Sequence, residues 1–130
     1  MLYDPQEDSF LMAEAILNLK PKGKVLDLGT GTGILAEAAS KSSSLITAAD
    51  KDMRAVMYVK HKFPAFNVVE SSYFSGISGK FDLIINNPPY LPNDDRIKDL
   101  ALDGGKEGWE FIDNMLSQAK KYLEVNGAFL

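Results

Sequence analysis

The sequence contains no cysteine. This excludes disulfides, zinc sites with thiolate ligands and cysteine nucleophiles, and it fits a chain that works in the reducing cytoplasm. Long apolar runs are also absent, since no stretch approaches the roughly 20 residues that cross a bilayer. The first residues, MLYDPQEDSF, are acidic where a secretory signal would be basic. We therefore expect a cytoplasmic protein with no membrane contact and no targeting segment.

The sequence has fewer basic than acidic residues. Lysine and arginine total 14 against 18 aspartate and glutamate, which gives a net charge of −4. Proteins that bind long nucleic acids usually carry a basic face, because neutralised phosphates provide most of the non-specific affinity. An acidic chain can still carry a local basic patch, but this charge balance favours other substrates over a polynucleotide.

Strand-like and helix-like patterns alternate along the 130 residues. We expect helices at 9–19, 34–41, after Asp52 and around 109–119, and strands at 24–28, 44–50, 66–70 and 80–85. A turn at Asn126-Gly127 would then open a fifth strand. This alternation predicts one doubly wound α/β domain, with a mostly parallel sheet covered on both faces. Because the chain stops inside the fifth strand, we expect C-terminal strands of the complete sheet to be missing.

The spacing of apolar residues also predicts which helix positions are buried. The expected positions are Phe10, Ala13, Ile16 and Leu17 in the first helix, and Met53, Val56 and Met57 in the helix that Asp52 would cap.

The turn after the first strand, DLGTGTG (27–33), is rich in glycine. Gly29 and Gly31 permit a tight turn and close approach of a ligand to the backbone. The spacing is G-x-G-x-G, and Ile34 replaces the last glycine of the dinucleotide motif G-x-G-x-x-G. Asp50 ends the second strand, where a carboxylate can accept hydrogen bonds from both hydroxyls of a ribose. A glycine turn alone can serve chain geometry only, but strand, turn, helix, strand and acid in this order predict a nucleoside-type ligand.

Asn87-Pro88-Pro89-Tyr90 follows the fourth strand and should border the same crevice. Proline lacks an N–H but keeps its carbonyl, and two prolines stiffen the backbone. The Pro88 carbonyl and the Asn87 amide oxygen would form two fixed acceptors suited to an –NH₂ group. The Tyr90 ring could attract a cation or stack on a planar group. The competing interpretation is a loop that simply leaves the strand.

Together VLDLGTGTG, Asp50 and NPPY resemble the S-adenosylmethionine-dependent methyltransferases that methylate amino groups. This class includes adenine and cytosine amino methylases and the HemK-type glutamine methylases of release factors. YDPQEDSFL (3–11) is similar to the N-terminal segment of the archaeal and eukaryotic HemK-type branch. ALDGGKEGWEFIDNML (101–116) resembles the segment that follows NPPY in HemK-type enzymes. The resemblance covers nearly the whole chain.

The resemblance implies S-adenosylmethionine as cofactor and assigns residues to its parts. Ser9 would touch the methionine end of the cofactor, and Asp27 and Gly29 would contact its amino acid portion within the turn that includes Gly31. Asp50 would bind the ribose, and Tyr73 would lie by the adenine ring. The acceptor would be held by Asn87, Pro88, Pro89 and Tyr90, and Asn87 would also border the cofactor. One position departs from the family pattern. Where the family has an aspartate for the adenine amino group, this chain has Ser72, a weaker acceptor, and a shifted alignment would offer Glu70 instead.

The resemblance further implies residues 1–23 as a cofactor-covering segment and helix, and 24–130 as the Rossmann-like core. The expected reaction is methyl transfer to a glutamine amide nitrogen in a protein, namely a translation release factor. Related enzymes pair with a small zinc-binding activator, so such a partner is a further expectation. Two alternatives stay open: adenine amino methylation of DNA or RNA, and a non-catalytic cofactor-binding subunit. His61 has no clustered partners, and we expect no metal site.

Overall fold

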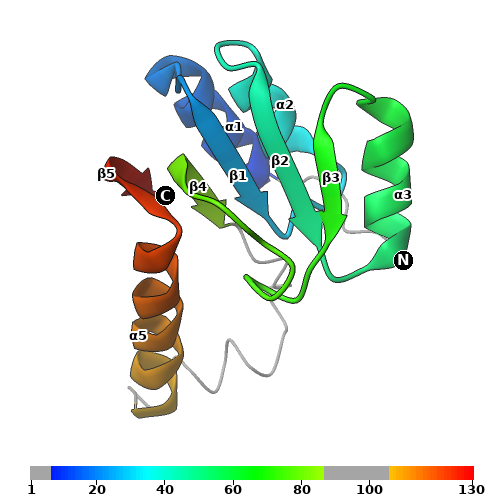
Figure 1. Ribbon diagram of the computed structural model, residues 1–130. Helices are drawn as coiled ribbons and strands as arrows, with labels where there is room; N and C mark the ends of the chain where they lie inside the picture. Colours follow the sequence, from blue (N-terminus) through cyan, green and yellow to red (C-terminus); the bar gives the residue numbers. More distant parts are fainter. Residues whose placement is uncertain (1–6, 87–105) are drawn as a thin grey trace.

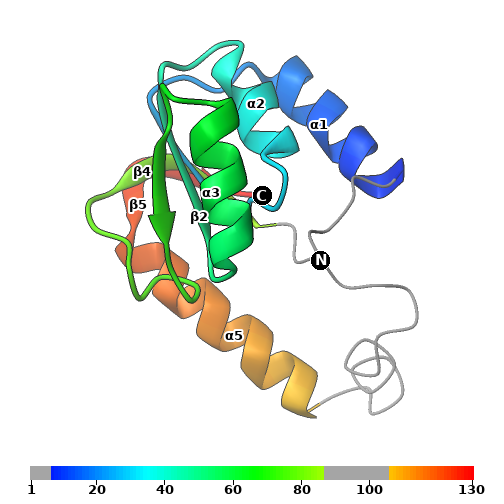
Figure 2. The same cartoon turned by 90° about the vertical axis from the view of Figure 1, so that its right-hand side faces the viewer.

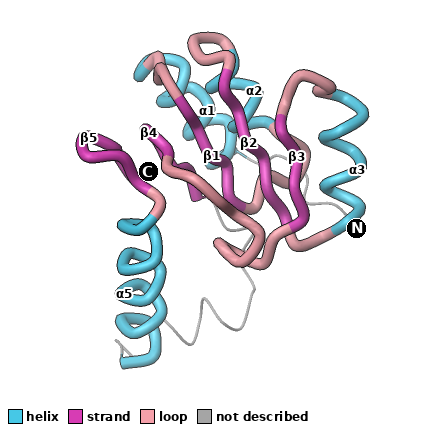
Figure 3. Tube along the Cα trace, in the orientation of Figure 1, coloured by secondary structure: helices cyan, strands magenta, loops and turns pink. Residues whose placement is uncertain are grey.

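The computed structural model describes residues 7–86 and 106–130, and the side chains of 9–86 and 113–130. Helices and strands alternate along these segments (Figures 1 and 3). They are α1 (Glu7–Leu19), β1 (Lys24–Leu28), α2 (Ile34–Ser40), β2 (Leu45–Asp50), α3 (Met53–Lys62), β3 (Asn67–Glu70), β4 (Phe81–Asn86), α5 (Lys106–Lys121) and β5 (Leu123–Phe129).

The strands form one five-stranded sheet in the order β3-β2-β1-β4-β5, and every pair of neighbours is parallel. Leu28 lies opposite Ala49 on one side and Asn86 on the other, while Asp50 lies opposite Glu70. The carboxyl ends of β1 to β4 therefore meet at one edge. The strand order reverses between β1 and β4, and this switch point is where open α/β sheets bind ligands. The predicted α/β fold is confirmed.

Helices cover both faces of the sheet. Figure 2 shows α1, α2 and α3 on one side and α5 on the other. Neighbouring residues of β1 point to opposite faces, so that Val25 packs under the first three helices and Leu26 under α5. The segment between β3 and β4 adds Phe74 to the α5 side, where its ring stacks on Tyr122 at 4.7 Å.

The buried faces of α1 and α3 differ in part from the predicted ones. Ala13 and Ile16 are buried as expected, but Phe10 and Leu17 are 57% and 43% exposed. The buried stripe of α1 is completed by Ser9, because small side chains let α1 lie close against α2. In α3 the buried residues are Ala55, Val56 and Val59, whereas Met53 and Met57 lie on the solvent side.

The predicted Asn126-Gly127 turn is wrong, because both residues lie inside β5. Phe81 pairs with Leu123 and Leu83 with Ala128, so β5 advances five residues where β4 advances two. The extra residues are accommodated as an irregularity of the bulge type. A Cβ on Gly127 would lie 3.0 Å from the Phe81 carbonyl oxygen. The glycine that resembled a turn signal therefore serves close approach of β5 to β4.

Candidate active site

Apart from Ser9 in α1 and Asp27 in β1, the predicted site residues lie at or after the carboxyl ends of neighbouring strands. The glycine turn follows β1, Asp50 ends β2, and the 71–76 turn follows β3. Asn86 ends β4 directly beside Leu28. The segment 87–90, which holds the predicted acceptor residues, lies outside the described residues, but it begins at this strand end. Parallel pairing thus gathers sequence segments up to about 60 residues apart at one edge.

The glycine turn is open on the side away from the protein. Gly29 and Gly31 have φ values of 70° and 57°, in the left-handed region that favours glycine. A Cβ placed on either residue would meet no atom within 4 Å. A Cβ on Gly33, in contrast, would lie 3.0 Å from the Phe63 ring. Gly33 therefore serves packing, while Gly29 and Gly31 leave free space into which a ligand could come close to the backbone.

Asp50 is tied to the same turn. Its Oδ2 accepts a hydrogen bond from the Gly31 N–H at 2.9 Å, and its Oδ1 accepts one from the Asp52 N–H at 2.9 Å. Each carboxylate oxygen can accept a further bond, so these contacts fix the orientation of Asp50 and leave acceptor capacity for ribose hydroxyls. The carboxylate and the turn are placed as one unit, which fits the predicted nucleoside ligand.

Asp27 lies below the turn rather than at its surface. It is 1% exposed, and its Oδ2 accepts a hydrogen bond from the Thr30 hydroxyl at 2.9 Å. Burial raises the pKa of Asp27 to about 7, against the hydrogen bonds from Thr30 and the Ala36 N–H, which lower it; the nearby Asp50 raises it slightly. With its carboxylate enclosed in this way, Asp27 supports the turn from beneath through Thr30.

Thr30 was not singled out by the sequence analysis. It is 5% exposed, and besides its hydroxyl contact its N–H donates to the Ala49 carbonyl at 2.9 Å. A polar residue between two glycines was the available signal, but its burial depends on β2 lying next to β1. Ser9 is fully buried in α1, on the same stripe as Ala13 and Ile16. Its predicted contact with the methionine end stays a prediction.

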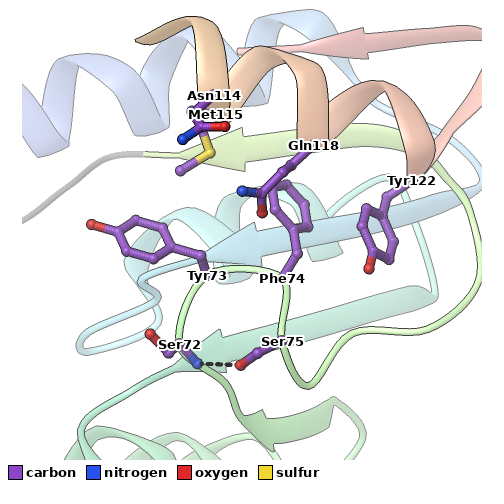
Figure 4. A pocket seen from close by; sticks show the side chains of 8 residues that line it. All are labelled: Ser72, Tyr73, Phe74, Ser75, Asn114, Met115, Gln118 and Tyr122. Carbon is purple, nitrogen blue, oxygen red and sulfur yellow. Dashed lines mark hydrogen bonds between the residues drawn. The ribbon is translucent and has the colours of Figure 1, made fainter. Parts of the chain in front are cut away.

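A pocket of about 450 Å³ lies between the turn after β3 and α5 (Figure 4). It contains both residues predicted to lie near adenine, Ser72 and Tyr73, and the Tyr73 side chain is 40% exposed. Of the two alternatives for the adenine amino group, Ser72 lines this pocket and Glu70 does not. The other lining residues are Phe74, Ser75, Asn114, Met115, Gln118 and Tyr122.

Together the open turn, the oriented Asp50 and the aromatic pocket fit the parts of S-adenosylmethionine. Within the described segments, no group of three histidine, aspartate or glutamate side chains is arranged to hold a metal ion. The helices that the structure describes include none with the length and apolar character needed to cross a membrane.

Known proteins provide an independent comparison. The family model described as "Methyltransferase small domain" matches residues 7–130. A relative from Methanocaldococcus jannaschii, provisionally named a protein N5-glutamine methyltransferase, is 38% identical over 97% of this chain and 68% of its own length. The release factor glutamine methyltransferase of Shewanella oneidensis is 35% identical over 97% of this chain and 51% of its own length. The chain thus spans between half and about two thirds of these relatives.

Among solved structures, this chain is similar to the E. cuniculi Mtq2-Trm112 complex, which is described as responsible for methylation of the eRF1 translation termination factor. It matches with a TM-score of 0.60 and 30% identity over 72% of this chain and 56% of that one. The sheet order, the open glycine turn and these matches agree with one another. The chain belongs to the methyltransferase small domain family, with the Rossmann-like fold of class I methyltransferases and S-adenosylmethionine as the implied cofactor.

Proposed function

We propose that this chain transfers a methyl group from S-adenosylmethionine to the side-chain amide nitrogen of a glutamine in a protein, and that the protein is a translation release factor. The observation that carries the proposal is the shared strand edge, where the oriented Asp50 and open glycine turn lie beside the end of β4, from which NPPY continues. The names of relatives from Methanocaldococcus jannaschii and Shewanella oneidensis support the choice of glutamine.

The cofactor would be held along this edge by groups already oriented in the structure. Asp50 would accept the ribose hydroxyls, and the backbone of Gly29 and Gly31 would receive the amino acid portion. Tyr73 would lie against the adenine ring. When bound, S-adenosylmethionine supplies an activated methyl group on a positively charged sulfur. Because the donor is already reactive, the chain's own task is to bind, align and desolvate.

The acceptor amide is a poor nucleophile, since its nitrogen lone pair is delocalised into the carbonyl. In our proposal the Asn87 side-chain oxygen and the Pro88 carbonyl accept both hydrogens of the –NH₂ group. Two fixed acceptors favour a pyramidal nitrogen, whose lone pair is then available for the methyl carbon. The nitrogen becomes acidic only as it is methylated, so no general base is needed beforehand. Tyr90 would border the sulfonium charge through its ring face.

The remaining expectations form part of the same proposal. Residues 1–23 would cover the cofactor, consistent with α1 packing against α2, the helix that follows the glycine turn. The solved Mtq2-Trm112 complex suggests a small partner subunit, which we propose here as a zinc-binding activator. A translation factor as substrate would place the activity in the cytoplasm. Adenine methylation in nucleic acid would use the same acceptor clamp, but the net charge of −4 gives it less support.

The test is to incubate the protein and methyl-labelled S-adenosylmethionine with a release factor, with the release factor whose loop glutamine is replaced by alanine, and with DNA and RNA. We expect label in the unaltered release factor only. Label confined to nucleic acid would replace the proposal with the adenine alternative. Cofactor binding without label in any acceptor, with and without an activator subunit, would favour a non-catalytic subunit.

A further inference from the structure

The turn that follows β3 is built around one buried serine. Ser71 is 5% exposed; its hydroxyl donates to the Tyr73 carbonyl at 2.6 Å and accepts from the Gly76 N–H at 2.8 Å. The Ser71 N–H donates to the Asp50 carbonyl at 2.9 Å. A Cβ on Gly76 would lie 2.7 Å from the Glu70 carbonyl oxygen, so no other residue fits there without a shift. The turn is thus rigid and directly connected to the strand end that carries Asp50.

This rigid turn holds Tyr73 in an unfavourable conformation. Its φ of 54° lies in the left-handed region, which bulky residues rarely adopt. Such strain persists where surrounding structure enforces it, and it concentrates at ligand sites. The side chain gains little burial in return, because it is 40% exposed and borders the pocket. The turn therefore places an aromatic ring at the wall of the cavity, where a planar ligand could stack on it.

The opposite wall of the pocket comes from α5. Asn114 and Gln118 lie one helical turn apart and so present their amides along the same face (Figure 4). Met115 between them is buried, and the stacked rings of Phe74 and Tyr122 form a firm apolar end. The volume of about 450 Å³ falls in the range of small-ligand sites. The pocket therefore combines a ring for stacking with two amides for directional hydrogen bonds.

An amide can recognise an adenine edge because it accepts and donates at adjacent atoms. Adenine presents its –NH₂ donor between two ring-nitrogen acceptors, N1 and N7, and asparagine and glutamine pair with the –NH₂ and N7 in protein–DNA complexes. The –NH₂ and N1 offer an amide the same donor–acceptor pattern on the other edge of the base. Ser72, which replaces the usual carboxylate here, provides a weaker acceptor for that –NH₂ group. A nearby amide would supply the missing selectivity.

We propose that Asn114, supported by Gln118, is the residue that distinguishes adenine from other purines in the cofactor, while Tyr73 stacks on the base. The inference rests on the proposed function, because it takes S-adenosylmethionine as the ligand. The Asn114 side-chain oxygen accepts from the adenine amino group, and its –NH₂ donates to the adjacent ring nitrogen N1. Hypoxanthine reverses this pattern, since it has a carbonyl and a ring N–H at the same positions.

The experiment compares the affinities of the complete protein for S-adenosylhomocysteine and S-inosylhomocysteine by calorimetry. We expect the wild-type protein to prefer the adenosyl compound by about tenfold or more, the discrimination typical of one bidentate contact. Asn114→Ala should reduce this preference to within about threefold, and Gln118→Ala should reduce it less. Asn114→Asp keeps the acceptor and loses the donor, so its preference should shift toward the inosyl compound. Asn67→Ala removes an exposed amide at the amino end of β3, the opposite end of that strand from the turn that carries Tyr73, and should change neither affinity.

The outcomes separate this inference from the function it rests on. If the wild-type protein binds S-adenosylhomocysteine but both α5 variants keep the full preference for adenine, the role of Asn114 is refuted and the methyltransferase proposal stands. If the wild-type protein binds neither compound, both proposals fail. Thermal unfolding of each variant shows whether it is folded; should Asn114→Ala unfold, the near-isosteric Asn114→Asp provides the same comparison.

Discussion

The two halves of the candidate cofactor site are built in different ways. On the β1–β2 side, the Asp50 carboxylate accepts hydrogen bonds from the backbone N–H groups of Gly31 and Asp52, so it is tied directly to the glycine turn. On the β3–α5 side, the pocket lies between two segments about 40 residues apart and is lined by side chains. The first half is fixed by hydrogen bonds to the backbone, and in our proposal it would bind the sugar and amino acid portions. The second half depends on how α5 packs, and we propose that the base is selected there.

We expect the largest effect on turnover from Asn87, the residue proposed to hold the substrate –NH₂ group, rather than from either half of the cofactor site. Asn87→Ala should lower turnover by roughly 10²–10³, about 2.7–4 kcal/mol, because a preorganised acceptor is lost as the nitrogen changes geometry. Asn87→Asp should be less damaging, since a carboxylate keeps the acceptor. Cofactor affinity should change far less in both variants. Turnover and S-adenosylmethionine affinity are the measurements, and wild-type turnover in Asn87→Ala would mean that the clamp does not exist.

Asp27, which supports the glycine turn from beneath, should make the free energy of unfolding depend on pH. Because the folded-state pKa of Asp27 is raised from 3.8 to about 7, the native state keeps a proton that the unfolded state releases. The free energy of unfolding should therefore fall as pH rises from about 4 to 7, by an amount on the order of 2–4 kcal/mol from this group, and its contribution should then level off.

Replacing the Asp27 carboxyl by an amide separates its contribution to the pH dependence of stability from that of the other titratable groups. Asp27→Asn can still bond to Thr30 but does not titrate, so its unfolding free energy should exceed that of the wild type above pH 7 and converge with it near pH 4. Urea unfolding at a series of pH values measures both curves. Curves that stay parallel across this range would contradict the assignment.

Asp50 tests the backbone-connected half directly. Asp50→Ala should weaken S-adenosylmethionine binding by about 1–3 kcal/mol, because hydrogen bonds to a charged group are lost and the turn loses its contact with Gly31. Asp52→Ala is the matched control two residues away. Asp52 caps α3 through the Arg54 N–H, so its removal should lower stability and leave cofactor affinity unchanged. Equal losses of affinity in the two variants would remove Asp50 from the site.

The smallest effects should separate the glycines that face the ligand from the one that serves packing. Gly31→Ala and Gly33→Ala both impose left-handed strain, which costs about 1–2 kcal/mol of stability. Gly31→Ala should also weaken cofactor binding, because its methyl group enters the open space over the turn. Gly33→Ala should instead lose further stability through its collision with Phe63. Thermal unfolding measures the stability of both variants, and calorimetry measures their cofactor affinity. A larger loss of affinity in Gly33→Ala than in Gly31→Ala would contradict the comparison.

The alternation of strands and helices and much of the site could be predicted because their signals are local. A buried strand followed by G-x-G-x-G can be predicted from a few neighbouring residues. The position of Asp50 at the end of β2 follows from the lengths of one helix and one strand. The Asp52 cap was predicted for the same reason and is confirmed by its bond to the Arg54 N–H. The exposed faces of Phe10 and Met57 could not be read in this way, since helical spacing leaves open which apolar side meets the sheet.

By itself, the sequence determined the alternation of strands and helices, the glycine turn, the acid after β2 and the motif that resembles an amino-methylating enzyme. Only the tertiary structure decided that Asp27 is enclosed beneath Thr30, that Asn126 and Gly127 lie inside β5, and that Asn114 faces the turn carrying Tyr73. The physical reason is that burial and pairing depend on which segments become neighbours in the sheet. The packing of the whole core determines which segments become neighbours, and no short stretch of sequence contains that information.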